Sequence, residues 1–136
     1  MAAPVSVEIT TVSADDTLHF SGSGTLTRDE RGTHLTYSYE NDGVSVSSQI
    51  HLGLGRAVIV TPSCRLLLDP DHPTQTQLSA EGITLPLTVE THRVHADLQG
   101  GAGTISMHYT LLAQGRPLQS MRVALALAPT DKERTL

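Results

Sequence analysis

Short runs in which apolar and polar residues alternate follow one another along most of the chain. Val5, Val7 and Ile9 begin the series, and residues 123–127 end it. Alternation with a period of two is typical of strands that bury one face, because successive side chains point to opposite sides of a strand. Turn-forming residues interrupt the runs roughly every ten positions. The pattern predicts about ten consecutive antiparallel strands and no helix.

The chain offers enough strands to close a sheet on itself. A long open sheet exposes two edges, and an up-and-down barrel removes them. We therefore predict a single all-β domain over residues 5–128, an antiparallel up-and-down barrel of about 8–10 strands, with a polar C-terminal tail at 129–136. The predicted strands between the two ends are TLHFSGSGTLT (17–27), THLTYSYE (33–40), VSVSSQIHL (44–52), RAVIV (56–60), CRLLL (64–68) and the alternations over 83–89, 94–98 and 105–111. DPDHPTQTQ (69–77) is predicted to be a loop.

Two inward glycines support closure of the sheet. Gly22 and Gly24 share the face of Leu18 and Leu26, and the next strand carries tyrosines on its inward face. Two registers are open: Gly22 lies opposite either Tyr37 or Tyr39. In both registers an inward tyrosine covers an inward glycine, which is typical of a sharply bent strand in a small barrel.

Composition excludes several classes of function. The chain has 136 residues, 9 Lys+Arg against 14 Asp+Glu, a net charge of −5 and no Trp. Nucleic-acid binding is disfavoured because it needs a basic stripe and aromatic platforms. No apolar run approaches the length of a membrane span. The single cysteine, Cys64, has no internal disulfide partner, and the first ten residues show no signal-peptide pattern, so we expect a cytoplasmic protein.

Three histidines surround the glycines of HRVHADLQGGAGTISMHYT (92–110). Apolar residues occupy odd positions up to Val89 and even positions from Val94, which predicts a β-bulge at His92-Arg93. With a hairpin turn at Gly101-Ala102, or a loop over 100–103, His95 is predicted opposite His108 on the outer face.

A metal site at this pair would need further ligands, and the outward candidates His92, Asp97 and Glu90 have no recognised spacing. The same parity places His19, His34 and His51 outward as well. Nucleophile-elbow, phosphate-loop and dinucleotide-binding motifs are missing from the sequence. We therefore predict no catalytic residue, no metal and no cofactor, and keep a metal-dependent enzyme using surface histidines as an alternative.

The predicted interior is the favoured place for function. Its aromatic, sulfur-containing and polar members are Phe20, Tyr37, Tyr39, Ser48, Thr91, Met107 and Tyr109. Buried tyrosine hydroxyls need partners, either from one another or from a ligand. Two interpretations remain open: a barrel that binds a small apolar or amphipathic ligand without chemistry, and a filled core that acts by homodimerisation or partner binding. Outward Ala124, Ala126 and Ala128 are the candidate dimer surface.

Several segments resemble a known family. HLTYSYE followed by NDG, then GITLPLTVETHRVHADL and GGAGTISMHYTLLAQG, are similar to the YwiB-like bacterial proteins from about Val5 to Ala128. The resemblance implies a calycin-like, or lipocalin-like, barrel and carries no established activity. The sequence departs from the family at TPSC (61–64), where an Arg and a Gly are expected, and it lacks the Gly-x-Trp signature of lipocalins.

Overall fold

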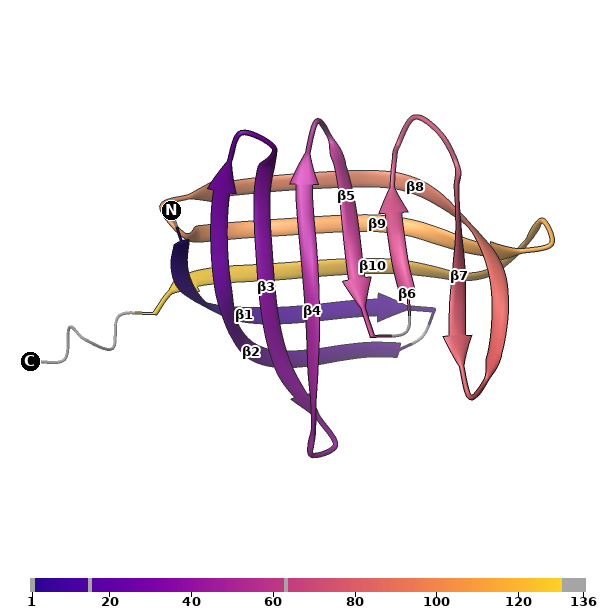
Figure 1. Ribbon diagram of the computed structural model, residues 1–136, viewed down its shortest axis with the longest axis horizontal. Coiled ribbons are helices and arrows are strands. Elements are labelled where there is room, and N and C mark those ends of the chain that lie inside the picture. The colour runs from indigo at the N-terminus through magenta and orange to yellow at the C-terminus, as the bar shows by residue number, and fades with distance from the viewer. Residues whose placement is uncertain (1, 15, 63, 131–136) are drawn as a thin grey trace, which may run out of the picture.

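The protein is a single ten-stranded antiparallel sheet that curls into a barrel (Figure 1). The computed structural model describes residues 2–14, 16–62 and 64–130, and the counts here refer to them. The strands are β1 (Ala2–Ser13), β2 (Asp16–Asp29), β3 (Gly32–Asn41), β4 (Val44–Gly53), β5 (Arg56–Thr61), β6 (Cys64–Leu68), β7 (Thr74–Ala80), β8 (Ile83–Gln99), β9 (Ala102–Ala113) and β10 (Arg116–Pro129). Their order in the sheet is β6-β5-β4-β3-β2-β1-β10-β9-β8-β7. In these ranges no helix is long and apolar enough to cross a membrane.

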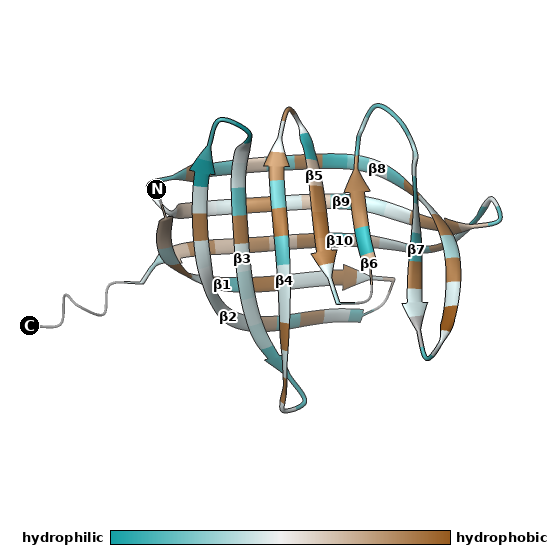
Figure 2. Cartoon of the chain, viewed as in Figure 1, coloured by the Kyte–Doolittle hydropathy of each residue, from teal (hydrophilic) through white to brown (hydrophobic). Residues whose placement is uncertain are grey.

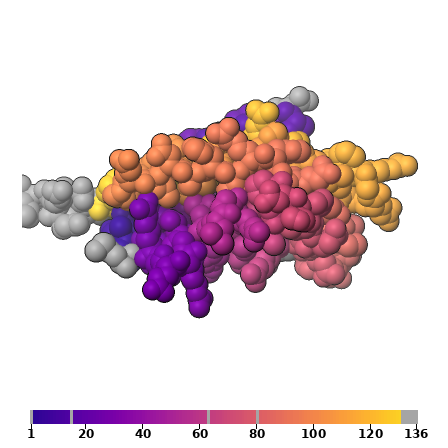
Figure 3. All heavy atoms as spheres, turned by 90° about the horizontal axis from the view of Figure 1, so that it is seen from above, coloured from indigo at the N-terminus to yellow at the C-terminus, as the bar shows by residue number. Residues whose placement is uncertain are grey.

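Two layers of strands cross each other, and two long strands connect them. Strands β1, β8, β9 and β10 form one layer, and β3 to β7 run across it (Figure 1). β2 pairs with β1 from Asp16 to Thr27 and with β3 from Gly22 onward. β8 pairs with β7 through its first part and with β9 from Thr88 onward. Seen from above, β8 (orange) lies against the layer of β3 to β7 (Figure 3). β2 and β8 are therefore the corners of the barrel.

The corner in β2 contains the two inward glycines. Gly22 pairs with Tyr39 and Gly24 with Tyr37, so the second of the two predicted registers is correct. A Cβ atom added to Gly24 would lie 2.8 Å from Cβ of Tyr37. The backbones of β2 and β3 approach each other too closely at this corner for any residue with a side chain.

The corner in β8 contains the predicted bulge. The register with β9 shifts between Thr91 and Arg93. The extra residue bends the strand and reverses the sidedness of everything that follows it. As a result, Val89 before the bulge and Val94 after it both pack against the core, although five positions separate them.

The barrel closes without a backbone ladder between β6 and β7. The hydroxyl of Thr74 donates a hydrogen bond to the carbonyl oxygen of Leu67, and the hydroxyl of Thr76 donates one to the carbonyl oxygen of Arg65. These side-chain bonds satisfy edge carbonyls that a ladder would otherwise pair. The β6–β7 seam is therefore joined by threonine side chains.

The buried interior consists mostly of aliphatic side chains. Figure 2 shows the hydropathy of the residues changing between brown and teal along the strands. Val5, Val7, Leu125 and Ile105 are among the residues that have no exposed surface. The all-β barrel and its number of strands are as predicted. Two boundaries differ: 83–89 and 94–98 belong to one strand, and the predicted loop 69–77 contains the start of β7.

β7 was missed because its first four residues, Thr74 to Gln77, alternate threonine with glutamine and give no apolar alternation. Of the predicted tail, Pro129 belongs to β10, and the backbone N–H of Thr130 donates to the carbonyl of Pro4. Residues 131–136 lie outside the described residues.

The substitution Gly24→Ala is expected to destabilise the fold by about 1–3 kcal/mol, because the new methyl group would overlap β3. Ser23→Ala, at the exposed neighbouring position, is the matched control and is expected to change stability by less than about 0.5 kcal/mol. Urea denaturation of both variants measures the difference. Equal stability of the two variants would contradict the close approach at this corner.

Candidate functional site

A cavity of about 220 Å³ lies inside one end of the barrel. Residues near the ends of β1, β3 and β5, namely Thr11, Tyr39 and Thr61, line it. Its walls come from seven strands and are mostly apolar. The residues that line it are Ile9, Thr11, Phe20, Tyr37, Tyr39, Ser48, Ile50, Ile59, Thr61, Met107, Tyr109, Met121 and Val123.

The cavity brings together six of the seven residues that the sequence placed in the interior, and Thr91 is the exception. Thr91 lies at the bulge and lines a shallow surface pocket with Glu90, His92 and the 69–73 loop. Its Oγ1 atom is buried and has no hydrogen-bond partner among the described residues. An unpaired buried hydroxyl costs free energy.

The polar groups of the cavity are hydroxyls. Tyr37 and Tyr109 are 8% and 6% exposed. Burial raises the pKa of Tyr37 to about 12, although a hydrogen bond from Ser48, its partner across the ladder, acts in the opposite direction. Burial also raises the pKa of Tyr109 to about 12, with smaller effects of the same sign from Cys64 and Tyr37. Both phenols are therefore neutral at physiological pH and can donate hydrogen bonds.

Three aromatic rings, those of Phe20, Tyr39 and Tyr37, lie side by side in the wall of the cavity. The rings of Phe20 and Tyr39 lie 4.8 Å apart, and those of Tyr39 and Tyr37 are stacked at 6.3 Å. Phe20 and Tyr39 are partly exposed, whereas Tyr37 is buried. These spacings are in the range of favourable aromatic pairs. The three rings form one continuous wall that a planar apolar molecule can contact.

Several lining residues were missed by the sequence interpretation, although the signal was present. Thr11 continues the inward parity of Val7 and Ile9, and Thr61 continues that of Ala57 and Ile59. Met121 likewise precedes Val123 by two positions. Extending each alternation by one step into polar residues would have found the two threonines.

The predicted pairing of His95 with His108 is wrong. Arg93 lies opposite His108, and His95 lies opposite Ser106. The reason is the turn, which uses Gly100 and Gly101 and not Gly101 and Ala102. Both glycines have positive φ, 60° and 85°, as a type I′ hairpin turn requires. The register is therefore two residues from the predicted one.

The outward histidines form two other pairs. The ring centroids of His92 and His108 are 4.6 Å apart. His34 and His51 face each other across β3 and β4, with 2.8 Å between their Nδ1 atoms, and Nε2 of His34 lies 3.1 Å from Oδ1 of Asp29. Burial, then His34 and Arg65, lower the pKa of His51. Among the described residues, no group of three or more His, Cys, Asp or Glu is placed to hold a metal ion.

The candidate dimer surface on β10 is not continuously apolar. Ala124, Ala126 and Ala128 are exposed, but their neighbours across the ladder with β1 are Thr10, Glu8 and Ser6. A homodimer through these alanines stays a prediction.

Comparison with known proteins places the chain in a family. A family model described as a domain of unknown function, DUF1934, matches residues 5–125. The chain belongs to the DUF1934 family. No match was found among curated proteins.

The fold of this DUF1934 domain matches a solved structure. The crystal structure of the YwiB protein from Bacillus subtilis superposes with a TM-score of 0.81 at 15% sequence identity, over 95% of this chain and 93% of that chain. The similarity confirms the predicted YwiB-like barrel. At this identity it concerns the fold alone.

Raising the pH above about 10 is expected to destabilise the DUF1934 barrel through its buried phenols. The pKa values of Tyr37 and Tyr109 are about 12 in the fold, above the ordinary value of 10.0. The folded state therefore holds these protons more tightly, and the stability they contribute is complete below the ordinary pKa and lost as pH rises through the folded value. Denaturation between about pH 9 and 12 measures the loss, which should be smaller for Tyr109→Phe. An identical fall in wild type and variant would count against buried, neutral Tyr109.

Proposed function

We propose that this protein binds a small, partly apolar ligand inside the barrel and does not transform it chemically. The observation that carries the proposal is the cavity, in which aromatic and sulfur-containing walls surround a few hydroxyl groups. Binding sites for small molecules generally combine apolar walls with a few polar groups that orient the ligand.

The size of the cavity limits the ligand. Its volume of about 220 Å³ is below the range of drug-sized sites, roughly 300–1,000 Å³. An apolar cavity of about 150 Å³ is known to hold benzene. A ligand of the size of a substituted benzene therefore fits, with its ring against Tyr37 or Phe20 and a polar substituent near the hydroxyls.

The chemistry of the lining supports binding over catalysis. None of the lining residues is a histidine, a carboxylate or a lysine. General acid–base catalysis needs a group whose pKa lies near the working pH, and the raised pKa values of Tyr37 and Tyr109 move these phenols further from neutrality.

Phenol is a suitable first probe, because it has one ring and one hydroxyl. Saturable binding to the wild-type protein is expected in ligand-observed NMR, and Val123→Phe is expected to abolish it by filling the cavity that Val123 lines. Val58→Phe, the same change on the outer face of β5, should leave binding intact.

Two further measurements keep the proposal falsifiable. If Val123→Phe does not fold, Val123→Ile adds a single methyl group and is expected to weaken binding of phenol. Native mass spectrometry of protein purified from its own host should show a bound small molecule. The proposal fails if phenol does not bind and no bound mass is found, or if binding of phenol is equal in the wild type and the folded Val123 variants.

A further inference from the structure

Two neighbouring rows of outward side chains on β8, β9, β10 and β1 contain cationic groups and no carboxylate. The pairings place the first row as Arg93, His108, Arg122 and Val12. The second row is His95, Ser106, Ala124 and Thr10. The chain as a whole has a net charge of −5, whereas the charge of these two rows is positive.

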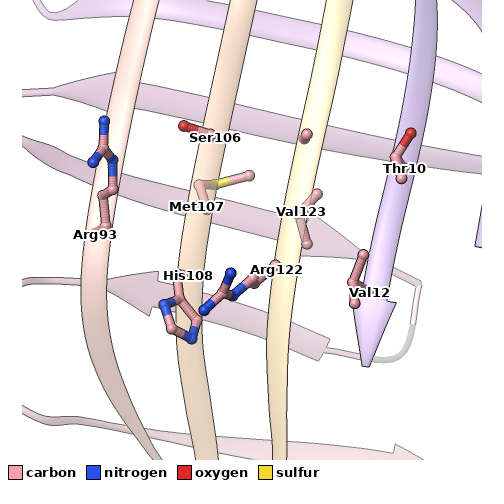
Figure 4. Close-up of a pocket in the computed structure, with 9 residues that line it drawn as sticks. Thr10, Val12, Arg93, Ser106, Met107, His108, Arg122 and Val123 are labelled. Atoms are coloured by element: carbon pink, nitrogen blue, oxygen red, sulfur yellow. The ribbon is translucent and has the colours of Figure 1, made fainter. Parts of the chain in front are cut away.

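A groove of about 370 Å³ follows these rows. Figure 4 shows the side chain of Arg122 extending from β10 toward His108 on β9, with Arg93 on the strand at the other side of His108. Ala124 and Ser106, which also line the groove, are small and leave room above the sheet. The groove thus combines a cationic end with a floor of short side chains.

Within residues 2–14, 16–62 and 64–130 the two arginines have no ionic partner. Neither Arg93 nor Arg122 belongs to a salt bridge among the described residues. The adjoining rows contain three carboxylates. Glu90 lies opposite Thr110 and Asp97 opposite Thr104, and neither belongs to a salt bridge among the described residues. Glu8 accepts a hydrogen bond from Ser21 and lies 2.9 Å from Nε2 of His19. The positive charge of the groove is therefore available to an external anion.

The imidazole between the arginines is held in place. The ring of His92 packs on that of His108, and Nε2 of His108 lies 3.3 Å from Oγ of Ser120. Burial, then Arg122 and His92, lower the pKa of His108. A positive environment disfavours protonation of the imidazole, and an anion bound there would favour it.

We propose that this outer groove binds the phosphate group of a small phosphate ester between Arg93 and Arg122. Neighbouring strands lie about 4.8 Å apart, so the Cα atoms of the two arginines are roughly 10 Å apart, with His108 between them. A phosphate group has three free oxygens and a charge of about −1.5 to −2 at neutral pH. It can therefore accept hydrogen bonds from both guanidinium groups and the imidazole at once.

A carboxylate fits the same groove less well. It carries a single charge and two oxygens, which one guanidinium group satisfies in a bidentate pair. The second arginine and His108 would then stay without an anionic partner. The remainder of a phosphate ester would lie over Ala124 and Val12, near the hydroxyls of Ser106 and Thr10.

Titration with inorganic phosphate and pyrophosphate, followed by calorimetry at low ionic strength, tests the site. Arg93→Gln and Arg122→Gln are each expected to lower affinity about tenfold, because each removes charge-assisted hydrogen bonds. Arg116→Gln is the matched control: Arg116 is exposed on the same strand as Arg122 but lies outside the groove. Added salt should weaken binding in the wild type.

Further arms identify the source of the phosphate. Binding to phosphatidic acid vesicles that is lost in both arginine variants would assign a lipid headgroup, whereas phosphate binding without vesicle binding would assign a soluble ester, and either result supports the site. Acetate, with one carboxylate group, serves as the carboxylate probe. The proposal is overturned if neither phosphate probe binds saturably, if acetate binds more tightly than inorganic phosphate, or if Arg116→Gln lowers affinity as much as Arg122→Gln.

Discussion

The close approach of β2 to β3 at Gly22 and Gly24 is the constraint on which the barrel and its cavity depend. A strand that belongs to both layers has to bend sharply, and a side chain at the bend would collide with the facing backbone. Tyr37 and Tyr39 lie opposite the glycines and contribute their rings to the cavity wall. The same pair of glycines thus allows the corner and lies beside two of the rings that line the cavity.

The corner in β8 bends at a bulge instead of at glycines, and this bulge affects the outer surface. One inserted residue in β8 bends the strand and resets which side chains face outward. Arg93 is thereby aligned with His108, and His92 packs its ring on the same imidazole. The two glycines of the following turn then fix the register of the hairpin. The bulge that bends β8 therefore also determines which side chains are neighbours on the outer face of the barrel.

The sequence predicted those features that depend on parity and missed those that depend on exact register. Alternation is a local property, so the strands, the bulge and the inward position of Tyr109 follow from it. The turn at Gly100 and Gly101 could not be chosen from composition, since three glycines lie within four residues, and a shift of two residues replaced His95 by Arg93 opposite His108. β7 was not predicted from the sequence for another reason. Thr74 and Thr76 donate hydrogen bonds across the seam, and polar side chains carry no hydrophobic period.

The seam between β6 and β7 is joined differently from the other pairs of neighbouring strands in the barrel. Opening a barrel elsewhere breaks a backbone ladder, whereas opening this seam at Cys64 and Thr76 breaks side-chain hydrogen bonds, each of which contributes about 1 kcal/mol. Cys64 lies close enough to Tyr109 to affect the pKa of its phenol, so this end of the seam is next to the cavity. The threonine-joined seam between β6 and β7 is therefore the place where two neighbouring strands of the barrel separate at the lowest cost in hydrogen bonds.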